Sequence, residues 1–288
     1  MQVSEGMGSE LISTPNDSLG KENFGEGVDG MRVEYRPRVG ARLVEKELEE
    51  LADGGADWLV DCAPIREPSF YRGQRSKPGL YWMASVGGHV SYESKFERDF
   101  LKRADFDGDV VQVLPQPIRL RFQRNEAPFR HTPDFLLRRA DATLELVDVK
   151  GAHARQKPIV RTAFTLTERA CHMFGWAFTV FTEPDPVEQA NIAWLSGYRS
   201  RLNQVLDVHA PALLAFAETD TLTAEQLAEG LATAEGVPFA VACAAVWRAV
   251  WKHVLHVGDL RRPLEMNTVL EPADVDCSHS PLENGAAR

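Results

Sequence analysis

The spacing of apolar and polar positions changes period along the chain, and each change marks a predicted element. Apolar residues at helical spacing predict a helix over 92–102, capped by Ser91, and a second over 159–174, ended by Gly175. Alternating or short apolar runs bounded by turn residues predict strands at 110–113, 118–122, 129–137, 144–150 and 176–181. This order of helix, strands, helix and strand predicts a compact α/β layer arrangement, with the strands from 110 to 150 forming a meander.

The pattern becomes mainly helical after Arg201. Short helices are predicted at 212–217, 223–232 and 238–255, followed by a hairpin or wing over 255–270. Thr223-Ala224-Glu225-Gln226 fits a capping box at the start of the middle helix. Three short helices and a wing predict a small winged-helix-like module.

The remaining segments complete a predicted domain map. The helical spacing of residues 43–51 predicts a short helix, whereas residues 1–30 are rich in Gly, Ser, Asn and acidic residues and are expected to be disordered. The expected parts are a disordered segment (1–30), an N-terminal extension (31–64), an α/β domain (65–205), a winged-helix-like domain (206–272) and a flexible tail (273–288).

Length and composition favour a protein of the cytoplasm. The 288 residues suit two domains, and no apolar run is long enough to cross a membrane. The N-terminus is acidic and polar, unlike a secretion signal. The four cysteines share no metal-ligand spacing and are expected to be buried thiols.

The net charge of −10 by itself argues against binding of nucleic acid, but the charge is unevenly distributed along the chain. Residues 1–60 carry −7 and residues 181–288 carry −8, whereas residues 61–180 carry +5. Nucleic acids respond to local basic patches more than to whole-chain charge. The middle block is therefore the candidate nucleic-acid surface, and the acidic flanks predict weak DNA affinity without a partner.

The basic block contains the most informative motif, His131-Thr132-Pro133-Asp134-Phe135 followed by Leu146-Val147-Asp148-Val149-Lys150. Alternate residues of a strand share a face, so Asp148 and Lys150 are expected to project together. Asp134, Asp148 and the carbonyl oxygen of Val149 would give Mg²⁺ the hard oxygen ligands that it prefers. Lys150 would orient or deprotonate water, or stabilise transition-state charge. The pattern predicts a metal-dependent nuclease, with a turn residue and a surface ion pair as the structural alternative.

A third carboxylate is expected from the preceding helix. Glu93 and Glu97 are four residues apart and share a helix face, and Glu97 is preferred because it lies nearer the helix centre. Gln116 and His131 are interpreted mainly as structural residues. The basic residues just after the motif would contact backbone phosphate or form a solvated charge run: Arg155, Lys157 and Arg161.

The ordered set of motifs resembles the PD-(D/E)xK nuclease superfamily, and more narrowly TnsA, the endonuclease subunit of heteromeric transposases. The residues that carry the resemblance are Glu93–Glu97, Asp105-Phe106-Asp107, Gln116-Pro117, His131–Phe135, Asp148-Val149-Lys150 and Asn191–Arg199. The likeness covers about residues 65–205 well and 206–272 loosely.

The resemblance implies a restriction-endonuclease-like fold that binds Mg²⁺, with Mn²⁺ as a substitute, and cuts the 5′ strand of double-stranded DNA at transposon ends. Its implied partners are a DDE transposase subunit similar to TnsB and an AAA+ regulator similar to TnsC. By motif position, the implied catalytic residues are Glu97, Asp134, Asp148 and Lys150. The implied metal ligands are Glu97, Asp134, Asp148 and Val149. A stand-alone restriction or repair nuclease and a non-catalytic scaffold that recruits a transposase remain as alternatives.

Overall fold

The computed structural model describes residues 30–53, 58, 62–66, 77–124 and 127–273. The disordered segment and the tail expected from the sequence lie outside these residues, apart from Gly30 and Ala273. The chain forms two compact units, one of residues up to 105 with 110–184, and one of 106–109 with the residues from 185 onward. No helix in the described part has the length and apolar character needed to cross a bilayer.

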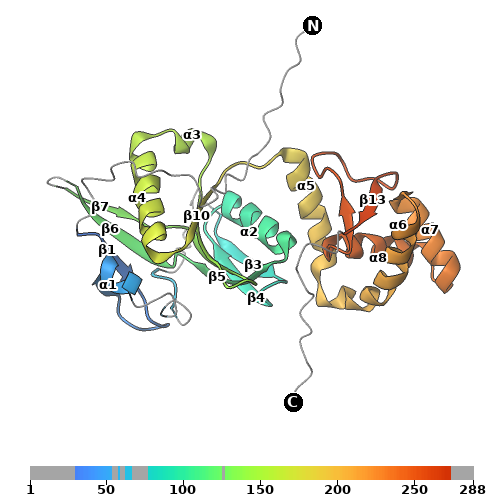
Figure 1. Ribbon diagram of the computed structural model, residues 1–288, viewed down its shortest axis with the longest axis horizontal. Coiled ribbons are helices and arrows are strands. Elements are labelled where there is room, and N and C mark those ends of the chain that lie inside the picture. Colours follow the sequence, from blue (N-terminus) through green and yellow to red (C-terminus); the bar gives the residue numbers. More distant parts are fainter. Residues whose placement is uncertain (1–29, 54–57, 59–61, 67–76, 125–126, 274–288) are drawn as a thin grey trace, which may run out of the picture. The chain divides into compact units, whose positions relative to one another are not determined.

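The first unit contains two four-stranded sheets and a two-stranded hairpin among its described residues, together with helices (Figure 1). The strand orders are β2-β1-β6-β7, β10-β9-β8-β5 and β3-β4. The strands are β1 (Arg32–Tyr35), β2 (Val44–Glu47), β3 (Gly79–Met83), β4 (Gly88–Tyr92), β5 (Val110–Pro115), β6 (Ile118–Arg124), β7 (Ala127–His131), β8 (Phe135–Arg139), β9 (Leu144–Val149) and β10 (Ala177–Phe181). The helices are α1 (Leu48–Asp53), α2 (Lys95–Asp107), α3 (Ala152–Arg155) and α4 (Pro158–Phe174). The mixed α/β class predicted from the sequence is confirmed.

The β10-β9-β8-β5 sheet is covered on both faces, and α2 and α4 lie to either side of it in Figure 1. Alternate residues of β8 and β9 point to opposite faces. One face packs on α2 through Phe135, Leu137, Val147 and Val149. The other packs toward α4 through Leu136 and Leu146. Asp148 therefore lies on the α4 face.

The predicted helix over 43–51 is wrong in its first half. Residues Val44–Glu47 form β2, which pairs antiparallel with β1, and only Leu48–Asp53 form a helix. Arg32 of β1 forms ion pairs with Glu45 and Glu47 across the sheet, which fixes these glutamates on a strand. The segment predicted as an extension is thus part of the first unit.

The predicted strand over 129–137 is also wrong, because the chain breaks at Thr132-Pro133-Asp134 into β7 and β8, which belong to different sheets. The meander predicted for 110–150 is therefore divided between two sheets. Pro133 has no N–H to donate to a ladder, which favours a break at this point. The break puts Asp134 at the start of β8.

Helix α2 begins later than the sequence pattern indicated. Ser91 lies in β4, and Ser94 accepts the hydrogen bond from the Glu97 N–H at 3.1 Å. Helix α4 agrees with its prediction, because Gly175 ends it in the left-handed conformation (φ 70°).

The second unit contains α5 to α8 and a three-stranded sheet of order β11-β13-β12. Its elements are α5 (Pro186–Leu195), the 3₁₀ helices η2 (Ser196–Arg199) and η3 (Arg201–His209), α6 (Ala210–Thr219), β11 (Leu222–Thr223), α7 (Ala224–Glu235), α8 (Phe239–Trp251), β12 (Leu255–Val257) and β13 (Val269–Pro272). The helix predicted over 238–255 ends at Trp251, and its last residue starts β12. The unit begins before the boundary at 205/206 expected from the sequence, because Ile192 and Leu195 of α5 are buried in its core.

The capping box that opens α7 supports a stability prediction. Gln226 N–H donates to Thr223 Oγ1 at 3.2 Å, and Thr223 N–H donates to Gln226 Oε1 at 2.9 Å. Thr223→Ala removes one of these bonds and should lower the free energy of unfolding by about 1 kcal/mol in urea titration. Thr233→Ala, on the exposed face of the same helix, is the matched control and should change it little. Equal stabilities of the two variants would contradict the prediction.

Candidate active site

The motif residues meet where β8 begins and β9 ends. Phe135 lies opposite Val147 in the antiparallel β8–β9 pair, so continuing the register by one residue puts Asp134 opposite Asp148. Asp134 N–H donates to Val147 O at 3.0 Å, and Asp134 O accepts from Gln116 N–H at 2.8 Å. These bonds hold the main chain of Asp134 on both sides.

Lys150 directs its ammonium group at three oxygen atoms. Its Nζ lies 3.3 Å from Asp134 Oδ2 and 3.5 Å from Asp148 Oδ1. The third oxygen is the main-chain carbonyl of Val149, also at 3.3 Å. Lys150 N–H donates to Phe181 O at 3.0 Å, which continues the parallel contact between β9 and β10 and fixes the start of the side chain. Two carboxylates and a carbonyl oxygen therefore converge on one cationic atom.

Asp148 is fully buried, and its two oxygens have different surroundings. Oδ2 lies 2.6 Å from Nε2 of His131, at the end of β7 in the other sheet. Oδ1 is buried and has no hydrogen-bond donor among the described residues. Its ion-pair contact with Lys150 at 3.5 Å is the interaction that remains. A buried carboxylate oxygen without a donor is costly, and a cation at this point would satisfy it.

The electrostatics of the site favour binding of a cation. Burial raises the pKa of Asp134 to about 7, and the charges of Asp148 and Glu97 add to the rise while Lys150 opposes it. Burial alone would lower the pKa of Lys150, but Asp134 and Asp148 outweigh it and raise that pKa. Lys150 is therefore an ammonium at neutral pH, and the Asp134 carboxylate ionises at a cost that additional positive charge would relieve.

The side-chain hydrogen bond of Glu97 lies outside this group of oxygens. Its Oε2 accepts the Glu93 N–H at 2.7 Å, while the Glu93 carboxylate pairs with Arg66 at 2.8 Å. Burial raises the pKa of Glu97, and the charge of Lys150 lowers it, so the two side chains are within electrostatic reach. Helix α2, which carries Glu97, packs on the sheet face opposite to Asp148.

The donors suit a hard cation, although a complete side-chain ligand set is not formed. Among the described residues, no three His, Cys, Asp or Glu side chains are grouped as ligands of one metal ion. Asp134 Oδ2, Asp148 Oδ1 and Val149 O are oxygen donors of the type that Mg²⁺ takes, with water completing its shell. The ammonium of Lys150 occupies the point where these three oxygens converge.

Two residues interpreted from the sequence as structural contact the site. His131 orients the Asp148 carboxylate, and Gln116 holds Asp134 through the main chain. Gln116 is buried at a positive φ of 44°, and its Oε1 accepts from Arg66 Nε at 2.8 Å. No local pattern predicts the contact of His131, because it joins two sheets. The unusual conformation of Gln116 likewise has no sequence signal.

No protein-family model matches the chain, and the search of curated proteins returned no match.

Proposed function

We propose that this protein is a metal-dependent DNA endonuclease that hydrolyses the 5′ strand at transposon ends as a subunit of a heteromeric transposase. The observation that carries the proposal is the convergence of Asp134 Oδ2, Asp148 Oδ1 and Val149 O on the Nζ of Lys150. This is the oxygen set that a PD-(D/E)xK nuclease needs for Mg²⁺, with its lysine beside it.

The proposed roles follow from the surroundings of each group. Asp134, Asp148 and the Val149 carbonyl would hold the metal, and His131 would orient Asp148 through its hydrogen bond. The chemistry that a bound Mg²⁺ supplies is polarisation of the scissile phosphate and activation of water. Lys150 would then face the phosphate as an ammonium and stabilise the charge that develops there. Glu97 would complete the site by rotating away from the Glu93 N–H.

The second unit fits the partner-binding part of the proposal. After η3 its element order is a helix, a short strand, two helices and a two-stranded antiparallel pair, which is compatible with a winged-helix-like module. We propose that this unit contacts the TnsB-like transposase or the TnsC-like regulator. The acidic charge of residues 181–288, at −8, favours binding to protein over direct binding to DNA.

The proposal is tested by cleavage of duplex DNA that carries the transposon end, in the presence of the DDE transposase. We expect a 5′-strand cut that requires Mg²⁺ or Mn²⁺, is abolished by EDTA, and falls by at least about a hundredfold in Asp148→Asn. Asp53→Asn, at an exposed aspartate of α1, is the matched control and should cut normally. Metal-independent cutting, or equal cutting by both variants, would refute the proposal.

A non-catalytic scaffold is the second candidate, and the lack of a complete side-chain ligand set among the described residues favours it. Calorimetry distinguishes the two. Heat of Mg²⁺ or Mn²⁺ binding that is lost in Asp148→Asn supports the nuclease, whereas assembly with the transposase and no metal binding supports the scaffold. Cutting by the purified chain alone would favour a stand-alone nuclease.

A further inference from the structure

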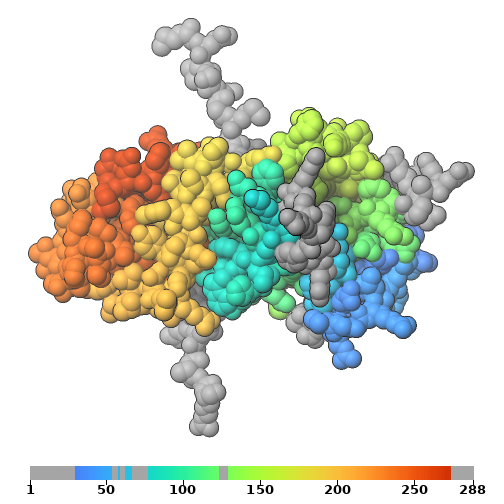
Figure 2. Space-filling view, turned by 180° about the vertical axis from the view of Figure 1, so that it is seen from behind, coloured from blue at the N-terminus to red at the C-terminus, as the bar shows by residue number. Residues whose placement is uncertain are grey.

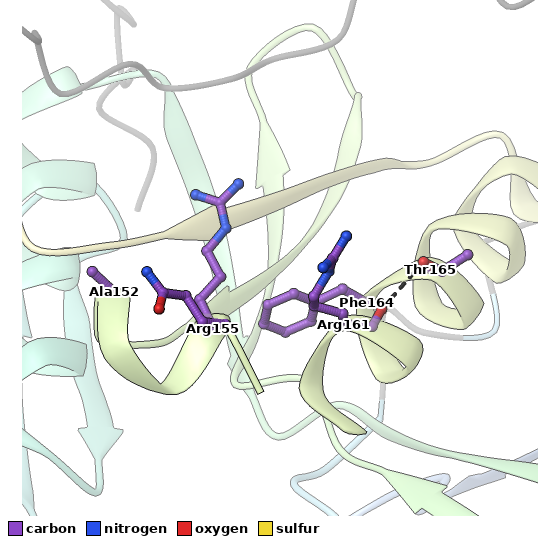
Figure 3. Close-up of a pocket in the computed structure, with 6 residues that line it drawn as sticks. Ala152, Arg155, Arg161, Phe164 and Thr165 are labelled. Atoms are coloured by element: carbon purple, nitrogen blue, oxygen red, sulfur yellow. Dashed lines mark hydrogen bonds between the residues drawn. The ribbon is translucent and has the colours of Figure 1, made fainter. Parts of the chain in front are cut away.

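A surface pocket lies between α3 and α4, just after the candidate catalytic lysine. It is lined by Ala152, Arg155, Gln156, Arg161, Phe164 and Thr165. This segment of the chain is at the surface, where it appears yellow-green in Figure 2. Figure 3 shows the side chains of Arg155 and Arg161 extending from neighbouring helices toward the same side of the pocket.

The two guanidinium groups have no anionic partner among the residues that the structure describes. Within the described ranges, neither Arg155 nor Arg161 forms an ion pair, although both are exposed. Three arginines on strands of the same unit differ in this respect, because Arg119, Arg121 and Arg139 pair with glutamates. The charges around the pocket are therefore not neutralised by the fold.

The sequence around the pocket has one sign of charge. From Lys150 to Thr167 the chain contains Lys, Arg and His but no Asp or Glu, in a protein of net charge −10. One acidic side chain in the described part of the chain reaches this segment, since Glu183 accepts the N–H of Ala152 at 2.7 Å. A local basic surface on an acidic protein marks a site for an anion.

The pocket is connected to the candidate active site through one aromatic side chain. The ring of Phe164, in the pocket wall, lies 6.4 Å from the ring of His131. His131 in turn contacts Asp148 at 2.6 Å. An anion in the pocket would therefore lie next to the group that we propose cuts a phosphodiester. This proximity favours a polymer of phosphates over an isolated anion.

We propose that the α3–α4 pocket binds the backbone of the DNA strand beside the scissile bond, with Arg155 and Arg161 each contacting one phosphate. The inference deepens the proposed function and rests on it for the identity of the ligand. Arginine forms two parallel hydrogen bonds to a phosphate, and the apolar ring of Phe164 offers a surface for the adjoining sugar or base.

The test measures binding of a fluorescently labelled random-sequence duplex to the full-length protein in EDTA, where cleavage is silent, over a range of salt concentrations. The double variant Arg155→Gln/Arg161→Gln should bind about tenfold more weakly. The slope of log Kd against log salt should fall by about 1 for each arginine. The matched control is Arg38→Gln/Arg42→Gln, which removes the same charge from the exposed turn between β1 and β2. It should leave the slope close to that of the wild type.

The outcomes separate this inference from the proposed function. Equal slopes and affinities for the two double variants, or no wild-type binding at low ionic strength, would overturn the pocket as a phosphate site. Loss of binding confined to the Arg155/Arg161 variant supports it, whether or not the protein cuts DNA. If the wild-type protein cuts DNA in a metal-dependent way but its DNA binding does not depend on these arginines, the nuclease proposal stands and the pocket proposal fails.

Discussion

Replacing Lys150 by alanine should lower the rate of metal-dependent DNA cleavage by about a thousandfold, because the variant loses the positive charge beside the scissile phosphate. The Nζ of Lys150 lies within 3.5 Å of Asp134 and Asp148, and their charges raise its pKa against the effect of burial. An ammonium held in this way stabilises developing charge and is poorly suited to accept a proton. Single-turnover cleavage of end DNA measures the effect.

Two further variants make the prediction specific. Lys150→Arg keeps the charge but changes its shape, so it should recover only part of the activity. Lys46→Ala removes an exposed lysine that pairs with Glu50 in the same unit, and it should cut at the wild-type rate. Cutting by Lys150→Ala within about threefold of Lys46→Ala would show that this ammonium has no role in the chemistry.

Replacing Asp134 by asparagine should make the protein more stable above pH 7. Burial raises the pKa of this aspartate from 3.8 to about 7, so ionising it in the folded state is costly. That difference corresponds to at most about 4 kcal/mol. Loss of the contact with Lys150 offsets part of the gain, so we expect about 2 kcal/mol in urea titration at pH 8.

The pH dependence of this effect has a definite sign. Between about pH 4 and pH 7 the folded wild type holds a proton on Asp134 that the unfolded chain has released, so its stability falls as pH rises through this range. The stability of Asp134→Asn should not fall in this way over the same pH range. The difference in the free energy of unfolding between the variant and the wild type should therefore disappear near pH 4. The exposed Asp53→Asn is the control. An Asp134→Asn variant less stable than wild type at pH 8 would contradict the prediction.

The sequence pattern was sufficient to predict those elements whose apolar spacing and end signals lie within their own residues. Helix α4 has a continuous apolar stripe and a terminal glycine, and α7 has its capping box, so both follow from short-range spacing. Strand β9 follows in the same way from its apolar run between turns. Segments that depend on partners were predicted less well, because Val44–Glu47 is a strand only when β1 is beside it.

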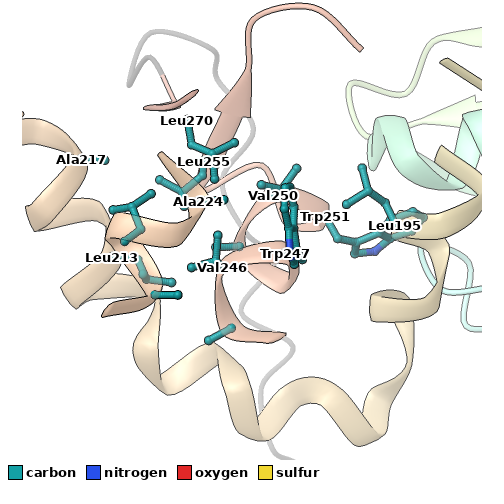
Figure 4. Packing of buried hydrophobic residues seen from close by; sticks show 14 of the residues in the cluster. Leu195, Leu213, Ala217, Ala224, Val246, Trp247, Val250, Trp251, Leu255 and Leu270 are labelled. Carbon is teal, nitrogen blue, oxygen red and sulfur yellow. The ribbon is translucent and has the colours of Figure 1, made fainter. Parts of the chain in front are cut away.

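The aromatic residues of the second unit show the same limit. Trp247 and Trp251, four residues apart on α8, are most simply core aromatics when read in the sequence, with a docking face as the alternative. Both are buried, and they pack in the cluster with Leu195, Leu213 and Leu255 (Figure 4). The choice depended on which elements cover the helix, and spacing along α8 carries no such information.

The sequence by itself determined that Asp148 and Lys150 project to the same side, because a strand repeats every two residues, and that Asp134 lies in the neighbouring apolar run. Only the tertiary structure decided their surroundings. His131 reaches Asp148 from another sheet, and α2, which carries Glu97, packs on the opposite face of the sheet. The physical reason is that strand period and turns act over a few residues, whereas sheet pairing and helix packing join residues far apart in the chain.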